Sequence, residues 1–156
     1  MGGMFNGCFN LQTIDVSNFD TSNVVDMNSM FSYCYSLEYI NLSNFDTRNV
    51  EDMFWMFLDC KSLKGVDVSS FDTSYVANFG GMFEGCINLE FLNITNFVFN
   101  SDIVVSYGNM FFEDYKAHLI MTAEFYYSII DQNEYLEDMN VTIIKLLLYI
   151  FTFYIF

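Results

Sequence analysis

Hydrophobic and polar positions recur along this chain with a spacing of 26 residues. The pair Met-Phe stands at residues 4–5, 30–31, 56–57, 82–83 and 110–111. Residues 4–29 are identical to residues 30–55 at 14 of 26 positions and to residues 56–81 at 12 of 26. Agreement over three consecutive blocks is too strong for chance and identifies an internal repeat.

The first half of each repeat alternates between apolar and polar positions. In the third repeat, Leu63 is followed by Val66 and Val68, with a polar residue between the two valines. This alternation, rich in β-branched residues, predicts a short strand with one buried face. The equivalent residues are Leu11, Ile14 and Val16; Leu37, Ile40 and Leu42; and Leu89, Leu92 and Ile94.

The second half of each repeat predicts a short helix. Its apolar residues follow one another at steps of three, three, one and three, which would place them on one helical stripe. The stripes are Val24, Met27, Met30, Phe31 and Cys34; Val50, Met53, Met56, Phe57 and Cys60; and Val76, Phe79, Met82, Phe83 and Cys86. Asn23 with Asp26, and Asn49 with Asp52, fit an N-cap followed by an acidic residue in the first turn.

One strand and one short helix cannot enclose their own apolar face, but a stack of such units can. The sequence therefore predicts an α/β, right-handed solenoid of about four turns over residues 1–111, with one short strand and one short helix per turn. Equivalent side chains of successive turns should contact one another. One such row is Phe19, Phe45, Phe71 and Phe97.

The repeat motif SNFDTSNV, flanked by MFxxC, resembles the repeat of BspA-like leucine-rich repeat surface proteins of bacteria and some protists. The resemblance covers residues 1 to about 111. It implies a leucine-rich-repeat-like solenoid, secretion or display at the cell surface, and a role in adhesion or host contact. Phe19 stands where the better-known leucine-rich repeat has an asparagine, so a buried asparagine ladder is not expected.

The N-terminus begins in the middle of a repeat, with Met1 at the position that Met27 and Met53 hold in later repeats. We expect this chain to be a piece of a longer array, with upstream repeats and a signal peptide outside it. The first twenty residues have neither the basic start nor the continuous apolar stretch of a secretory signal.

The repeat pattern fades after residue 111, and residues 112–156 are predicted to form a degenerate C-terminal segment. Residues 119–137 resemble an aromatic-rich helix. Residues 141–156 form an apolar tail that contains Lys145 and is shorter than the about 20 residues that span a bilayer. The tail has three interpretations: a membrane anchor, a C-terminal helix that covers the open end of the solenoid, or sequence that follows a lost reading frame.

Composition narrows the class of protein. A hydrophobic fraction of 53% excludes an intrinsically disordered chain. Five Lys and Arg residues against twenty Asp and Glu residues give a net charge of -15. Nucleic-acid binding needs a basic patch, which this chain does not offer, and an anionic membrane surface is disfavoured for the same reason.

The residues that suggest chemistry all have structural interpretations. Cys8, Cys34, Cys60 and Cys86 recur once per repeat and are predicted to be buried thiols, with a disulfide between neighbouring turns as the alternative. A zinc site would need cysteine pairs two to four residues apart. Asp15, Asp20, Asn23 and Asp26 supply oxygens that calcium could use, but these are spread over a strand, a turn and a cap, so structural hydrogen bonds are expected.

Catalytic machinery is not expected. His118 is the only histidine and belongs to no motif with a serine or cysteine nucleophile. No glycine-rich phosphate loop follows a predicted strand. The sequence therefore predicts a non-enzymatic protein with no catalytic, cofactor-binding or metal-binding residues.

The outward positions of the strands form a regular polar grid that contains two aromatic residues. This candidate partner-binding face comprises Thr13, Asp15, Ser17, Tyr39, Asn41, Ser43, Asp67, Ser69, Phe91, Asn93 and Thr95. Solenoids commonly bind partners along such a surface, although a simply solvated face would have the same pattern. The ligand would be a protein or a glycan.

The leading hypothesis is an interaction or adhesion module of a repeat-containing surface protein, located at the cell surface or secreted. The alternatives are a structural spacer or membrane-tethered stalk anchored by residues 141–156, and a truncated gene remnant without selected activity.

Overall fold

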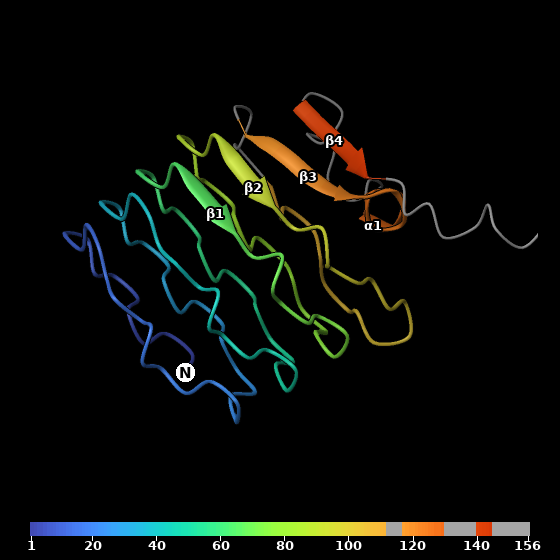
Figure 1. Ribbon diagram of the computed structural model, residues 1–156, viewed down its shortest axis with the longest axis horizontal. Helices are drawn as coiled ribbons and strands as arrows, with labels where there is room; N and C mark the ends of the chain where they lie inside the picture. Colours follow the sequence, from blue (N-terminus) through green and yellow to red (C-terminus); the bar gives the residue numbers. More distant parts are fainter. Residues whose placement is uncertain (112–116, 130–139, 145–156) are drawn as a thin grey trace, which may run out of the picture.

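The computed structural model describes residues 1–111, 117–129 and 140–144. Its regular elements are the strands β1 (Gly65–Asp67), β2 (Phe91–Asn93), β3 (His118–Thr122) and β4 (Asn140–Ile144), and the helix α1 (Ala123–Ile129). The four strands form one open parallel sheet in the order β1-β2-β3-β4. The 26-residue repeats lie side by side as a series of similar loops (Figure 1).

The predicted strands are confirmed in the third and fourth repeats. Val66 of β1 and Leu92 of β2 are register partners and are buried, while their neighbours Gly65 and Phe91 face outward. A single β-bridge between Tyr39 and Gly65 extends the same parallel pairing to the second repeat. The alternation of apolar and polar residues therefore identifies the two faces of the sheet correctly.

The predicted helix in the second half of each repeat is wrong. In the second repeat, the N–H groups of Phe31 and Tyr33 donate to the carbonyls of Met56 and Leu58 in the next repeat, at 2.9 and 2.7 Å. Cys34 N–H closes a tight turn onto the carbonyl of Phe31 at 3.1 Å. Alternate N–H groups thus bond sideways to the next repeat instead of along a helix, which would need bonds to the fourth preceding residue.

Left-handed residues explain why a helix cannot form there. Tyr33 has φ of 59°, and an L-residue with positive φ interrupts a right-handed helix. Two positions of the repeat have this conformation, with φ between 52° and 75°: Gly3, Ser29, Trp55, Gly81 and Asn109 at the first, and Gly7, Tyr33, Asp59 and Gly85 at the second. The resulting turns bring apolar residues inward at intervals of three and four, which is the spacing that also predicts a helix.

The proposed N-caps are also wrong, because no helix follows them. The Asp26 carboxylate accepts a hydrogen bond from the N–H of Asn28 at 2.8 Å, and Asp52 accepts one from Phe54 at 2.8 Å. Each carboxylate therefore closes a local turn of the type that Asp and Asn favour.

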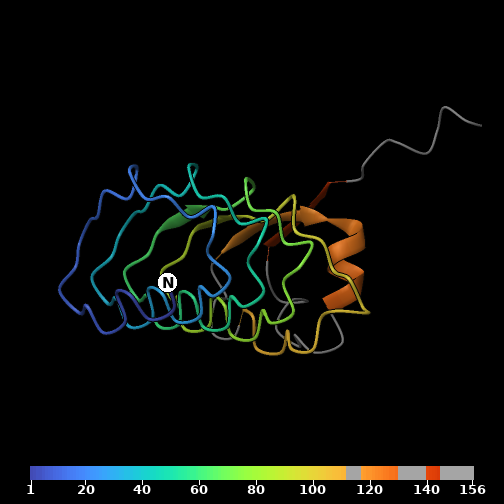
Figure 2. The same ribbon diagram turned by 90° about the horizontal axis from the view of Figure 1, so that it is seen from below.

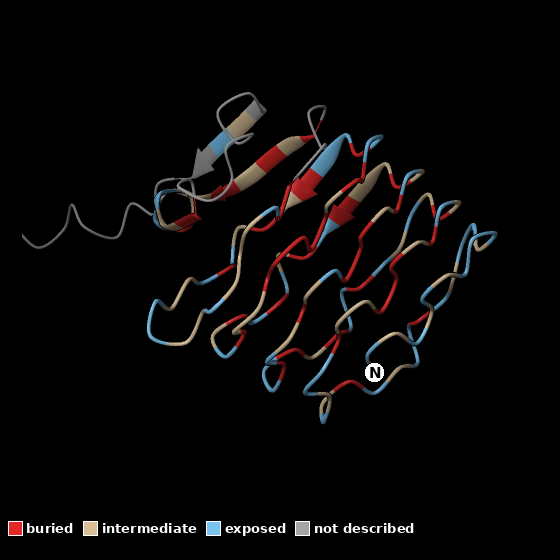
Figure 3. Cartoon of the chain, turned by 180° about the vertical axis from the view of Figure 1, so that it is seen from behind, coloured by how far each residue is buried: buried red, intermediate tan, exposed pale blue. Residues whose placement is uncertain are grey.

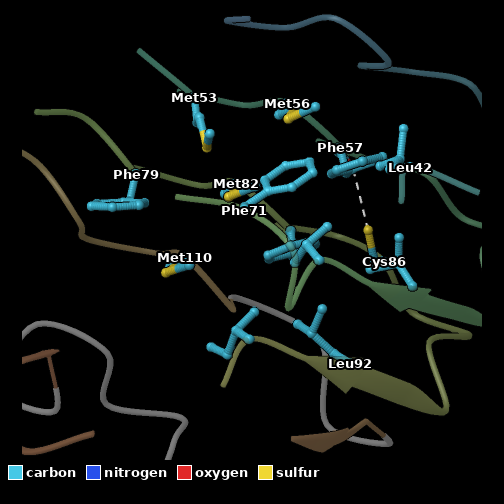
Figure 4. Packing of buried hydrophobic residues seen from close by; sticks show 14 of the residues in the cluster. Leu42, Met53, Met56, Phe57, Phe71, Phe79, Met82, Cys86, Leu92 and Met110 are labelled. Atoms are coloured by element: carbon cyan, nitrogen blue, oxygen red, sulfur yellow. Dashed lines mark hydrogen bonds between the residues drawn. The ribbon is translucent and has the colours of Figure 1, made fainter. Parts of the chain in front are cut away.

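Equivalent side chains of successive repeats stack inside the molecule, as the period predicts. The rings of Phe31 and Phe57 are 5.4 Å apart, those of Phe57 and Phe83 are 5.5 Å apart, and those of Phe83 and Phe111 are 6.2 Å apart, all nearly parallel. Phe57, Met56 and Met82 lie close together in the buried cluster (Figure 4). Buried residues alternate with exposed ones in every loop (Figure 3).

The phenylalanines of the motif SNFDTSNV are not all buried to the same extent. Phe45, Phe71 and Phe97 are buried, and the rings of Phe45 and Phe71 are stacked at 6.4 Å. Phe19 is only half-buried and packs against Phe5 at 6.1 Å. The row therefore lies in the core except at its N-terminal member, where the stack ends.

The threonine of the same motif forms a buried hydrogen-bond ladder. The Thr21 hydroxyl donates to the carbonyl of Asp46 at 3.1 Å and accepts from the N–H of Asp46 at 2.7 Å. Thr47 and Thr73 repeat this arrangement with Asp72 and Val98, respectively. Each buried hydroxyl thus satisfies both backbone polar groups of one residue in the next repeat.

All four cysteines are reduced thiols. Cys34, Cys60 and Cys86 are buried as predicted, and each thiol donates to a phenylalanine carbonyl in the preceding repeat at 3.2 Å. The bond from Cys86 to Phe57 is drawn in Figure 4. Cys8 is exposed, which corrects the prediction for that residue, because no described repeat lies on its outer side.

The C-terminal region differs from the predicted helices. Residues 118–122, expected in part to be helical, form strand β3, and α1 covers only residues 123–129. The start of the apolar tail, residues 141–144, belongs to β4 and is not helical, because it pairs in parallel with β3. The rest of both predicted helices, residues 130–137 and 145–156, lies outside the described residues.

Helix α1 lies at the end of the core opposite to the N-terminus (Figure 2). Its Phe125 is buried and makes edge-on contacts with Phe79 at 6.2 Å and Phe97 at 5.7 Å. Within the described residues, no helix has the length and apolar character needed to cross a membrane. The predicted domain boundary at residue 111 stays a prediction, although β3 and β4 join the sheet that the repeats begin.

Candidate binding face

The eleven residues of the candidate face lie on the outward side of the loops and strands. Val66, Leu92 and Leu119 occupy the buried side of the same sheet. Eight members are exposed: Thr13, Asp15, Ser17, Tyr39, Asn41, Ser43, Asp67 and Phe91. The other three are half-buried: Ser69, Asn93 and Thr95.

A row of Asp and Asn side chains runs across this face and is held in fixed positions. In each repeat the Oδ1 atom accepts a hydrogen bond from the N–H group two residues later. The distances are 2.9 Å for Asp15, 3.0 Å for Asn41, 2.9 Å for Asp67 and 3.2 Å for Asn93. These Asx turns order the side chains before any partner arrives, which lowers the entropic cost of binding.

Hydrogen bonds lower the pKa values of the two aspartates in this row. Hydrogen bonds from the hydroxyl and N–H of Ser17 lower the pKa of Asp15. For Asp67, burial raises the pKa, but hydrogen bonds from Ser69 and Asn93 outweigh it and the net pKa is lowered. In both cases the hydrogen bonds favour the ionised form of the carboxyl group.

Two aromatic residues stand on either side of a glycine. Tyr39 is bridged to Gly65, and Gly65 is the register partner of Phe91, so the three share one row across the face. The side chain of Tyr39 is 57% exposed and that of Phe91 is 39% exposed. Adjacent strands lie about 4.8 Å apart, which separates the backbones that carry the two rings by about 9.6 Å.

The glycine between them is not required by the backbone. Gly65 is not among the residues with positive φ, and an added Cβ would make only ordinary contacts, at 3.7 and 3.8 Å from Phe91. A side chain at this position would instead fill the space between the two rings. We call this space, bounded by Tyr39, Gly65 and Phe91, the aromatic slot.

A charged pair borders the aromatic slot. Lys64 Nζ lies 2.5 Å from a carboxylate oxygen of Glu38 and 5.5 Å from the centre of the Tyr39 ring. The hydrogen bond with Glu38 raises the pKa of Lys64. The contact of the ammonium with the ring restrains Tyr39 by a cation–π interaction.

A hollow of about 290 Å³ lies farther along the same two repeats. Asn41 is two residues from Tyr39, and Asp67 is two residues from Gly65, so each shares its outward direction. The lining residues are Ile40, Asn41, Leu42, Ser43, Asp67, Ser69 and Ser70. Four members of the candidate face, Asn41, Ser43, Asp67 and Ser69, therefore surround one recess, which we call the polar hollow.

Other candidate chemistry is not assembled in the described part of the chain. His118 Nε2 lies 2.6 Å from the hydroxyl of Thr142 on the neighbouring strand. Among residues 1–111, 117–129 and 140–144, no group of three or more His, Cys, Asp or Glu side chains could hold a metal ion. Asp20 and Asp26, considered for calcium, instead accept hydrogen bonds from N–H groups two residues later.

The candidate face was predictable from the alternation, but the slot and hollow were not. The sequence places Tyr39 and Phe91 in separate repeats, and the register of the strands confirms that Gly65 lies between them. A signal was present in the repeat alignment, since Gly65 is aligned with Thr13, Tyr39 and Phe91. A lone glycine at an outward strand position marks a gap in the side-chain grid.

Comparison of the sequence with known proteins shows the family to which this chain belongs. No curated protein and no solved structure matches the chain. A protein-family profile described as "Mycoplasma protein of unknown function, DUF285" matches residues 1–125, which include all the repeats, β3 and the start of α1. The chain therefore belongs to this DUF285 family.

Proposed function

We propose that this chain is a non-enzymatic binding module whose repeats form a right-handed, leucine-rich-repeat-like solenoid. The candidate face is its contact surface for a partner protein or glycan. On the strength of its repeat motif, we assign it to the BspA-like type of surface protein, secreted or displayed at the cell surface in an adhesive role.

The observation that carries this proposal is the aromatic slot. Single exposed aromatic residues are common on protein surfaces. Tyr39 and Phe91, however, lie in one row on the same face, and the intervening position is glycine although its backbone tolerates a side chain. The adjoining polar hollow adds ordered hydrogen-bonding groups. Apolar surface with a few fixed polar groups is typical of binding sites.

The test is a binding screen with matched variants. The purified chain is applied to a glycan array and to a panel of purified extracellular proteins, together with the double variant Tyr39→Ala/Phe91→Ala. Tyr75→Ala is the control, because Tyr75 is 63% exposed but lies outside the candidate face. We expect at least one ligand that binds the parent chain and the control but not the double variant.

A spacer would behave differently in the same screen. Its repeats would supply length without recognition, so no ligand would distinguish the double variant from the control. That result would exclude a binding role for the candidate face.

A further inference from the structure

We propose that the aromatic slot and the polar hollow together form a carbohydrate site for a neutral or amino-sugar oligosaccharide. This inference rests on the proposed binding function and names its ligand class. One pyranose ring would sit over Gly65 between Tyr39 and Phe91, and a neighbouring sugar unit would occupy the polar hollow.

The dimensions of the slot suit a sugar ring. The backbones that carry the two aromatic rings are about 9.6 Å apart. A guest in contact with both rings needs about 3.5–4.0 Å on each side, or roughly 7–8 Å for a flat group. A puckered pyranose is thicker than a flat ring and presents C–H groups on its faces. It therefore fills the space better than an inserted aromatic side chain.

The polar hollow matches the hydroxyl groups of the next sugar unit. Its outward side chains are the amide of Asn41, the carboxylate of Asp67 and the hydroxyls of Ser43 and Ser69. Together they donate and accept hydrogen bonds, as sugar hydroxyls do. Asn41 and Asp67 are already fixed by Asx turns, at 3.0 and 2.9 Å, so little side-chain freedom is lost on binding.

Charge selects among glycans. The net charge is -15, and the carboxylates of Asp15 and Asp67 lie on the face itself. The nearest cation, Lys64, is paired with Glu38 at 2.5 Å. Sulfated or uronic glycans would meet repulsion, whereas a neutral or protonated amino sugar would not.

The character of the face also favours a glycan over a protein partner. The fully buried centre of a protein interface is enriched in aromatic residues and depleted of charge. Here the two aromatic residues stand in a grid whose other members are all Thr, Ser, Asn or Asp. This grid can satisfy a polar ligand without leaving buried groups unpaired.

The experiment is isothermal titration of the full chain with three tetrasaccharide probes: the neutral N-acetylglucosamine oligomer, its cationic deacetylated form, and a heparin fragment. The key variant is Gly65→Val, which fills the slot while leaving the backbone unstrained, because a Cβ there meets nothing closer than 3.7 Å. Tyr39→Ala removes one wall, and Tyr75→Ala is the control.

We expect binding of the neutral or the cationic probe, no binding of heparin, and a loss of about tenfold or more in Gly65→Val and Tyr39→Ala. Binding that Gly65→Val leaves unchanged, or a preference for heparin, would overturn the carbohydrate site. If no glycan binds but a protein ligand depends on Tyr39, the carbohydrate inference fails and the binding module stands. If neither class of ligand depends on Tyr39, both proposals fail.

Discussion

The hydroxyl of Thr47 forms two hydrogen bonds with the backbone of Asp72, donating to its carbonyl at 3.0 Å and accepting from its N–H at 2.8 Å. Thr47 is 2% exposed, so its hydroxyl has little contact with water and is paired with these two backbone groups. The threonine of the FDT sequence thus joins successive repeats at a buried position where a strand ladder is absent.

Replacing this hydroxyl should destabilise the chain. Thr47→Val keeps the shape but leaves the N–H and carbonyl of Asp72 without their partner, at a cost of about 1–3 kcal/mol in the free energy of unfolding. Thr47→Ser keeps the hydroxyl and is the matched control. Urea denaturation followed by circular dichroism measures both, and equal stability of the two variants would contradict the role of the ladder.

Substitution by alanine should destabilise the chain at Gly85, which has positive φ, and stabilise it at Gly65, which does not. Gly85 has φ of 75°, and a Cβ there would collide with the Asp59 carboxylate, so Gly85→Ala should lower the free energy of unfolding by about 1–2 kcal/mol. Gly65→Ala should raise it by about 0.5 kcal/mol, because alanine restricts the unfolded chain and no neighbour obstructs it. Thermal denaturation provides the comparison. A destabilised Gly65→Ala would show that the slot glycine is structural.

The cysteines should differ in their reaction with iodoacetamide. Burial raises the pKa of Cys34 to about 12, so its reactive thiolate is scarce at pH 8 as well as inaccessible. Cys60 and Cys86 are also fully buried, whereas Cys8 is exposed. Mass spectrometry should find one adduct, at Cys8, in the native chain and four in urea. An iodoacetamide adduct on Cys34 in the folded chain would contradict the burial of Cys34, Cys60 and Cys86.

Acid should destabilise the chain between about pH 4 and pH 2. Hydrogen bonds from the Arg48 side chain lower the pKa of Asp46 to about 2, and the pKa values of Asp15, Asp20, Asp67 and Asp72 are also lowered. Unfolded aspartate has a pKa of about 3.9, so the unfolded chain takes up protons first as pH falls. The stabilisation is therefore present above pH 4 and is lost as pH falls through the folded pKa values.

A variant with asparagine at residues 15, 20, 67 and 72 tests this prediction. Asparagine keeps the Oδ1 acceptor, as Asn41 and Asn93 do in the same kind of turn, but does not titrate. The melting temperature of the variant should fall less between pH 4 and pH 2 than that of the parent chain. An equal fall in both would assign the acid sensitivity to other groups.

The contacts between repeats could be predicted because they depend only on the period. A spacing of 26 places Phe31, Phe57 and Phe83 at equivalent positions, and the rings are stacked accordingly. The outward direction of Tyr39 and Phe91 followed from alternation in the same way. Both predictions can be made without knowing the local backbone conformation.

The backbone of the second half could not be predicted from the spacing of apolar residues. Turns and a helix both bring residues inward at intervals of three and four. Tyr33 and Trp55 have positive φ without being glycine, so no glycine in the second repeat marks these turns. Gly81 at the end of the third repeat and Gly85 in the fourth hold the same two positions, and comparison of the repeats there was the available signal.

The sideways hydrogen bonds make the length of the array adjustable. The column of β-bridges that joins Asp26, Asp52, Asn78 and Ser106 presents nearly the same donors and acceptors at each step. Duplication or loss of one 26-residue block would join surfaces that already fit each other. An insertion of a single residue would turn buried rows toward water unless, as between Asn78 and Ser106, the extra residues are accommodated in a loop. Genes for such chains can therefore expand or contract by whole units without new packing having to evolve.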